Sequence, residues 1–128
     1  PNVEFLGKIK PEELSKIYSQ AIAFIHPQIE DFGITAVESM ASGRPVIAYA
    51  SGGACETVVE RKTGKFFDEQ TWEALADTIV RFKAENFNPI EIKNYAEQFG
   101  VERFKEEIKK FVEIERQKLL NSQIKCGN

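Results

Sequence analysis

Residues 30–48 constrain the fold of this chain more than any other segment. They begin with a polar loop that holds a Phe-Gly step, continue with apolar residues at helical spacing, and end in an apolar run of strand length. We therefore expect a loop, a helix from about Gly33 to Ser42, and a buried strand from Pro45 to Tyr49. Glycine adopts the left-handed backbone that ends helices, so Gly43 should cap this helix.

Three further apolar runs have the length of strands: Val3–Leu6, Ala21–Ile25 and Gly64–Phe67. Continuous apolar runs, unlike alternating ones, suit a parallel sheet that is covered on both faces. Apolar residues at helical spacing predict helices that begin near Pro11, Ser51, Trp72, Ile90 and Val101. The alternation predicts an α/β fold with a parallel sheet of about four strands, flanked by helices, and a helical extension after the break at Asn88-Pro89.

Composition excludes several classes of protein. Hydrophobic residues make up 42% of the chain and charged residues 29%, which fits a single globular domain. The net charge is −3 and no basic patch is visible, which argues against nucleic acid as a partner. No apolar stretch approaches the length of a membrane span. Cys55 and Cys126 lie far apart without metal-ligand spacing, which favours two free thiols in a reducing cytoplasm and no metal site.

The start of the helix near Gly33 is the first candidate binding site. Free backbone N–H groups at a helix start attract anions, phosphate above all. The missing Cβ of Gly33 lets a ligand approach the backbone. We expect Phe32, Gly33, Ile34 and Thr35 to act through their backbone N–H groups, and the Thr35 hydroxyl to add a further contact. The Phe32 side chain itself is expected in the core rather than in a stacking role.

Glu30 and Glu38 stand on either side of this helix start. Ile34, Val37 and Ala41 should form the buried face of the helix, with Glu38 at its edge. A carboxylate there is costly unless it finds hydrogen-bond donors, and adjacent ribose hydroxyls would supply two. Carboxylates beside a phosphate site suit a ligand with hydroxyls at both ends, such as a sugar nucleotide.

The order of four motifs resembles the retaining GT-B glycosyltransferases of group 1, which include glycogen-synthase-like and mannosyl transferases. These motifs are Phe5-Leu6-Gly7, the box from Glu30 to Glu38, Gly43-Arg44-Pro45-Val46-Ile47-Ala48 and Gly52-Gly53-Ala54-Cys55-Glu56. The resemblance covers about Val3 to Arg81 and is strongest to the mannosyltransferase branch. It implies that residues 1–87 are part of a Rossmann-like domain that binds a nucleotide-sugar, and that residues 88–128 are a helical extension of that domain.

The resemblance also implies roles for single residues. Glu38 would hold the ribose, and Glu30 would act in catalysis by contacting hydroxyls of the transferred sugar or stabilising charge near its anomeric carbon. The nucleotide base would lie near Ile9 and Lys10. The donor would be GDP-mannose or a UDP-sugar, and no metal cofactor is expected. His26, at a strand end on the ligand side, is expected to be hydrogen-bonded locally rather than to act as a base.

In the resembled family, the run Val3–Leu6 lies midway through the C-terminal domain, so we expect this chain to be a fragment. An acceptor glycan or lipid would then bind to an N-terminal domain, and the isolated chain would transfer no sugar. We expect the whole protein to be cytoplasmic, or peripheral to the inner face of the membrane. Without its upstream neighbours Val3–Leu6 would be an open edge, which predicts self-association.

Two alternatives belong to other functional classes. The chain could be a non-catalytic nucleotide-binding module that acts with another chain, since intact Glu30 and Glu38 do not separate a fragment from a stand-alone module. A dinucleotide dehydrogenase is the weaker alternative, because no strand here is followed by a Gly-x-Gly-x-x-Gly turn.

Overall fold

The computed structural model describes residues 2–125 of the chain, and side chains as far as residue 121. It divides into two compact units, Pro1–Glu97 and Gln98–Asn128. The first unit holds the whole sheet. The expected boundary between residues 87 and 88 therefore falls inside the first unit.

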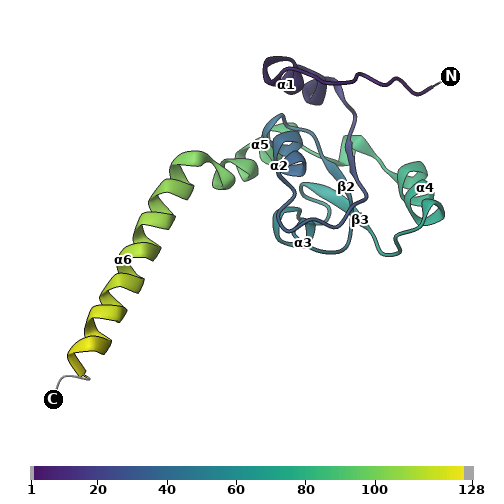
Figure 1. Ribbon diagram of the computed structural model, residues 1–128. Coiled ribbons are helices and arrows are strands. Elements are labelled where there is room, and N and C mark those ends of the chain that lie inside the picture. The colour runs from purple at the N-terminus through teal and green to yellow at the C-terminus, as the bar shows by residue number, and fades with distance from the viewer. Residues whose placement is uncertain (1, 126–128) are drawn as a thin grey trace. The chain divides into compact units, whose positions relative to one another are not determined.

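A parallel sheet of three strands forms the centre of the first unit (Figure 1). Its order is β1 (Phe24–His26), β2 (Val46–Tyr49) and β3 (Gly64–Phe67). In the central strand β2, the first three side chains are buried, so both faces of the sheet are covered there. This confirms the α/β class and the parallel pairing that the continuous apolar runs predicted.

Helices alternate with the strands along the chain. They are α1 (Pro11–Gln20), α2 (Ile34–Ala41), α3 (Ala54–Thr57), α4 (Trp72–Arg81), α5 (Pro89–Ala96) and α6 (Val101–Lys125), with 3-10 turns η1 (Ala84–Asn86) and η2 (Glu97–Phe99). Local sequence explains where several of them begin. The Thr71 side chain accepts a hydrogen bond from the Ala74 N–H at 3.2 Å, and Asn88 caps α5 with Pro89 in its first turn.

The expected strand Val3–Leu6 does not form, and this prediction was wrong. Among the described residues, the sheet has three strands instead of about four. A strand persists only where a neighbour completes its ladder of hydrogen bonds, and the side chain of Phe5 is instead 94% exposed. The next strand is also displaced, since β1 begins at Phe24 rather than Ala21 and includes His26.

The buried face of α2 also differs from the prediction. Its buried side chains are Ala36, Ser39 and Met40, whereas Ile34 is 63% exposed. Small residues at positions 36 and 39 leave room for close packing against the sheet and α5, where Met40 and Ile92 are fully buried. Ile34 instead faces solvent, and Ala41 lines a cavity between α2 and α1.

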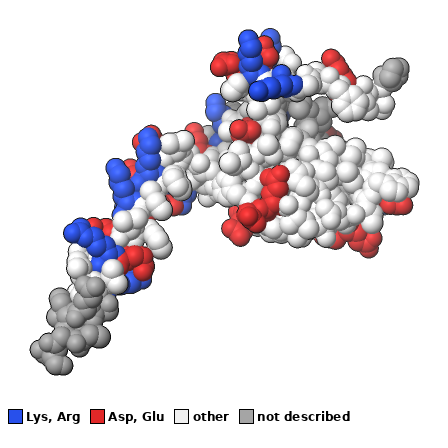
Figure 2. Space-filling model, viewed as in Figure 1, with Lys and Arg blue, Asp and Glu red and all other residues white. Residues whose placement is uncertain are grey.

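The second unit is dominated by α6, the long helix that the sequence predicted. Its described side chains are exposed, and oppositely charged residues pair along it at spacings of three and four. Figure 2 shows these basic and acidic side chains mixed along the helix. Such pairs add a few tenths of a kcal/mol each, roughly 0.2–0.5 kcal/mol, and so support the helix itself.

Two sequence expectations concern membranes and thiols. None of the helices in the described part of the chain is long and apolar enough to cross a membrane. Cys55 is a free, exposed thiol, as predicted, while Cys126 lies outside the described residues.

The contact between α2 and α5 yields a prediction about stability. Replacing the fully buried Ile92 by alanine should lower the free energy of unfolding by about 2–5 kcal/mol, because it leaves a cavity where α5 packs against α2. The matched control is Ile90→Ala, on the same helix but 70% exposed, which should change it by less than about 0.5 kcal/mol. Urea unfolding followed by circular dichroism measures both. Equal losses in the two variants would contradict this packing.

Candidate functional site

The helix α2 begins at a glycine that the geometry requires. Gly33 is its N-cap and has a left-handed backbone with φ of 79°. A Cβ at this position would lie 3.3 Å from Nε2 of His26. Glycine therefore satisfies both the backbone angle and the close approach of the histidine ring.

The first turn of α2 presents unused hydrogen-bonding groups. The N–H groups of Ala36 and Val37 donate to the Gly33 carbonyl at 3.0 and 3.3 Å, whereas those of Ile34 and Thr35 have no acceptor among the described residues. The Thr35 hydroxyl is buried and also lacks a partner there. Together with the positive end of the helix dipole, these groups are the kind of arrangement that suits an anion.

His26 lies next to Gly33 at the start of α2. Its side chain is fully buried, and neither ring nitrogen has a hydrogen-bond partner in the described part of the chain. The expected local hydrogen bond is therefore absent from the structure. Buried polar groups without partners are rare in proteins and mark places where a ligand or water completes the bonding.

Glu30 and Phe32 lie in the loop that leads into α2. Glu30 is exposed, and the Gln28 side-chain amide donates a hydrogen bond to its carboxylate at 3.0 Å. Phe32 is 44% exposed, so the expectation that its side chain belongs to the core was wrong. Backbone contacts with the turn at Gly52 and Gly53 hold this loop in place.

Gly52 and Gly53 hold this loop through backbone contact. The Gly53 N–H donates to the Glu30 carbonyl at 2.7 Å. A Cβ at Gly52 would lie 2.6 Å from that same carbonyl oxygen, and a Cβ at Gly53 would collide with the Asp31 carbonyl. Only glycines let the turn after β2 approach the loop after β1 so closely.

Glu38 lies four residues beyond Ile34, on the same exposed side of α2. The Tyr18 hydroxyl donates to its Oε2 at 3.5 Å. Its side chain borders a cavity of about 310 Å³ between α1 and α2, whose walls are Pro11, Leu14, Ser15, Tyr18, Glu38, Ala41 and Ser42. No sequence motif marks Tyr18, which the pattern only places in the helix that begins near Pro11.

Ile9 and Lys10 precede α1, and Lys10 is its N-cap. Ile9 is half-buried and Lys10 is exposed. The following residue, Pro11, lines the cavity that contains Glu38, so the structure brings this turn close to Glu38. Glu30, in contrast, lies in the loop before α2, whereas Glu38 is part of the helix.

No group of three His, Cys, Asp or Glu side chains suited to a metal ion occurs among residues 2–125.

Comparison with known proteins places this arrangement in a family. The model of glycosyl transferases group 1 matches residues 1–99. The chain belongs to that family. Its relatives include a D-inositol 3-phosphate glycosyltransferase of Corynebacterium urealyticum, 37% identical over 97 residues that cover 75% of this chain and 23% of the relative. A second relative is a GDP-mannose-dependent alpha-(1-6)-phosphatidylinositol monomannoside mannosyltransferase of Mycobacterium tuberculosis. It is 36% identical over 87 residues, which cover 62% of this chain and 23% of the relative.

A solved structure confirms the fold of this group 1 chain. Sucrose-phosphate synthase from Thermosynechococcus elongatus has a TM-score of 0.60 and 38% identity, over 73% of this chain and 23% of that one. The chain thus spans about a quarter of the length of each of these three proteins.

The Tyr18–Glu38 contact predicts a dependence on pH. Burial, then the charge of Glu38 and the hydrogen bond to it, raise the pKa of Tyr18 above its ordinary value of 10.0. The folded chain therefore holds the phenolic proton more tightly than the unfolded chain. This contribution to stability is complete below pH 10.0 and is lost as the pH rises through the raised pKa.

Phenol absorbance during an alkaline titration measures this effect. The Tyr18→Phe variant should lose the component that titrates above the ordinary range, and Glu38→Gln should move that component to lower pH. A Tyr18 titration unaffected by Glu38→Gln would contradict the contact.

Proposed function

We propose that this chain binds the donor in a retaining glycosyltransferase that moves a sugar, with mannose favoured, from a nucleotide-sugar to an acceptor hydroxyl. The observation that carries the proposal is the start of α2. There, the N–H groups of Ile34 and Thr35 have no acceptor among the described residues, and carboxylates stand before and after them. Membership in the group 1 family supports the reaction class.

The diphosphate would bind at the helix start. The N–H groups of Ile34 and Thr35 and the Thr35 hydroxyl would donate to its oxygens, and the absence of a Cβ at Gly33 leaves the backbone accessible. When the bond to the sugar breaks, negative charge develops on the leaving diphosphate. Donors fixed in place beforehand stabilise that charge without reorganising.

The nucleoside would occupy the cavity between α1 and α2. Its volume of about 310 Å³ lies at the lower end of the range for small-molecule sites. Glu38 would accept hydrogen bonds from the ribose hydroxyls. The turn at Ile9 and Lys10 would lie beside the base, because the adjacent Pro11 forms part of the wall.

Glu30 would serve the sugar end of the donor. It is exposed in the loop before α2, and the contacts of Gly52 and Gly53 fix the backbone of that loop. A carboxylate there can accept hydrogen bonds from sugar hydroxyls and stabilise positive charge at the anomeric carbon. This role needs no metal ion, and we propose that none takes part.

Mannose is favoured because the M. tuberculosis relative is named for GDP-mannose and mannosyl transfer. The alternative function is a nucleotide-binding module without catalysis that acts with another chain. Both functions include nucleotide binding. Only the enzyme also transfers a sugar, so only the enzyme has a transfer rate that a change at Glu30 would reduce.

The division of roles between the glutamates can be tested by substitution. Glu38→Gln should weaken binding of GDP or UDP to this chain by roughly 1.5–3 kcal/mol, since it removes charge-assisted hydrogen bonds. Glu30→Gln should leave nucleotide affinity unchanged and reduce sugar transfer by the full-length protein. Glu73→Gln, at an exposed position in α4, is the charge-matched control. Calorimetry and transfer assays measure these effects, and equal losses of affinity at Glu30 and Glu38 would contradict the proposal.

We further propose that the chain self-associates through β1. Only β2 pairs with β1 among the described residues, and Ile25 on β1 is 42% exposed. An open edge with an apolar side chain invites pairing with another chain. This edge replaces the one first expected at Val3–Leu6.

Light scattering over a dilution series tests the edge. The average mass should rise with concentration, and Ile25→Lys should abolish the rise because a charged edge resists pairing. Val80→Lys, at a position on α4 that is 84% exposed, should leave the rise intact. A monomer at every concentration would refute self-association.

A further inference from the structure

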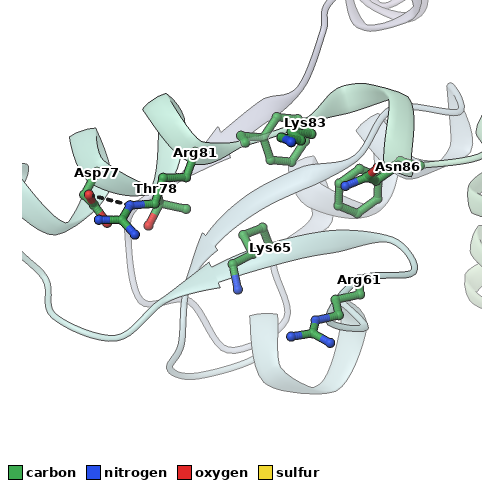
Figure 3. Close-up of a pocket in the computed structure, with 9 residues that line it drawn as sticks. Arg61, Lys65, Asp77, Thr78, Arg81, Lys83 and Asn86 are labelled. Carbon is green, nitrogen blue, oxygen red and sulfur yellow. Dashed lines mark hydrogen bonds and ion pairs between the residues drawn. The ribbon is translucent and has the colours of Figure 1, made fainter.

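A basic cavity lies between the start of β3 and the end of α4, and it is outside the proposed donor site (Figure 3). Its volume is about 410 Å³, which is within the range of small-molecule sites. The side chains that line it are Arg61, Lys65, Asp77, Thr78, Arg81, Phe82, Lys83, Asn86 and Phe87.

The cavity lies at the amino ends of the strands, whereas α2 starts beyond their carboxyl ends. The loops that carry Glu30 and Gly52 follow the carboxyl ends of β1 and β2. Arg61, in contrast, precedes β3, and Lys65 is its second residue. Because the strands are parallel, their amino ends lie together at one end of the sheet and their carboxyl ends at the other end. A ligand of this cavity therefore does not compete for the donor site.

Positive charge dominates the cavity although the whole chain has a net charge of −3. Of its ionisable side chains, four are cationic and only Asp77 is anionic. Arg81 pairs with Asp77 at 2.8 Å, and Lys65 pairs with Glu60 just outside the lining. Arg61 and Lys83 have no ion pair within residues 2–125. Four cations thus face two carboxylates.

The existing ion pairs do not use up this charge. The side chains of Arg81 and Asp77 are 78% and 59% exposed, and those of Lys65 and Glu60 are 45% and 37% exposed. Exposed pairs of this kind contribute little to stability. An anion in the cavity could therefore engage Arg81 or Lys65 at small cost, while Arg61 and Lys83 are already available.

Arg61 has an unusual backbone. Its φ of 64° is the only positive value at a non-glycine residue in the described part of the chain. Its N–H donates to the Gly64 carbonyl at 2.9 Å, which fixes the turn before β3. Glycine would adopt this conformation without strain, so an arginine here points to a function for its side chain.

Two aromatic rings give the cavity an apolar wall. Phe82 and Phe87 stack with centroids 5.1 Å apart and an interplanar angle of 17°. Asn86, between them in sequence, contributes a side-chain amide to the same lining. Figure 3 shows Lys83 and Asn86 on the η1 side of the cavity, with Lys65 and Arg61 across from them.

We propose that this cavity binds a small phosphate monoester whose body is a ring. A phosphate monoester carries nearly two negative charges at neutral pH and matches cations on opposite walls. The ring would pack on the Phe82–Phe87 wall, and the Asn86 amide would hydrogen-bond to the ester. Such a group can come from a soluble sugar phosphate or from a lipid headgroup, which share this chemistry.

The first experiment is a titration of the isotope-labelled 128-residue chain with phenyl phosphate, followed by amide chemical shifts. Resonances of Arg61, Lys65, Lys83 and Asn86 should move, and they should move at lower concentrations than with inorganic phosphate or phenol alone. Movement confined to Gly33, Ile34 and Thr35 would overturn the proposal, because that would place the phosphate at the donor site. Absence of any movement near the cavity at millimolar phenyl phosphate would overturn it as well.

Variants make the assignment specific. Arg61→Gly removes the guanidinium at a position where glycine relieves the backbone, so loss of binding cannot be attributed to strain. Arg61→Gly and Lys83→Gln should each weaken the affinity for phenyl phosphate about tenfold. Lys93→Gln, on α5 and outside the lining, should change it less than about twofold. Equal effects of Lys93→Gln and Lys83→Gln would reduce the cavity to a general attraction of charge and overturn the proposal.

Vesicles separate the two sources of the phosphate. Sedimentation with phosphatidylcholine vesicles that contain phosphatidylinositol 4-phosphate, but not with phosphatidylcholine alone, would assign the site to a lipid headgroup if Arg61→Gly abolished it. Shifts with phenyl phosphate without sedimentation would assign it to a soluble ester. Sedimentation that persists in both Arg61→Gly and Lys83→Gln would contradict a role for this cavity in lipid binding.

Discussion

The close approach of two backbone segments organises this molecule. The turn at Gly52 and Gly53 lies against the loop of Glu30 and Asp31 so tightly that a single added Cβ would meet backbone atoms. One hydrogen bond, from the Gly53 N–H to the Glu30 carbonyl, fixes the contact. This contact joins the carboxyl ends of two neighbouring parallel strands and sets the direction from which the chain enters α2. The proposed anion site and the place of Glu30 both depend on it.

The helix α2 then serves two purposes with different sides. Its small buried residues, Ala36 and Ser39, allow close packing against the sheet and α5. On its other side Ile34 is exposed, and Glu38 borders the cavity between α1 and α2. The same helix therefore anchors the fold and presents the proposed ligand contacts. Buried His26 under Gly33 links these roles, because its ring packs where the helix begins.

The carboxyl and amino ends of the parallel strands, here called the carboxyl edge and the amino edge of the sheet, differ in how they would hold an anion. At the carboxyl edge, backbone N–H groups and a helix dipole provide the attraction, with no basic side chain in the proposed donor contacts other than Lys10. At the amino edge, side-chain cations around the cavity of Arg61 and Lys83 provide it. Backbone donors are rigid and directional, whereas long side chains adapt to their ligand. A phosphate group bound at one edge would therefore be held differently from one bound at the other.

The sequence by itself determined the local elements of this protein. Helical spacing and Gly43 predicted α2, and continuous apolar runs predicted β2 and β3. The tertiary structure decided which surfaces are buried. Periodicity identified an apolar face of α2 through Ile34, but packing buried the face with Ala36 because small side chains approach a sheet more closely. Val3–Leu6 has the composition of a strand and forms none, and Arg61 and Lys83 share a cavity although the sequence separates them. Pairing, burial and the meeting of distant charges depend on neighbours in space, which no local pattern specifies.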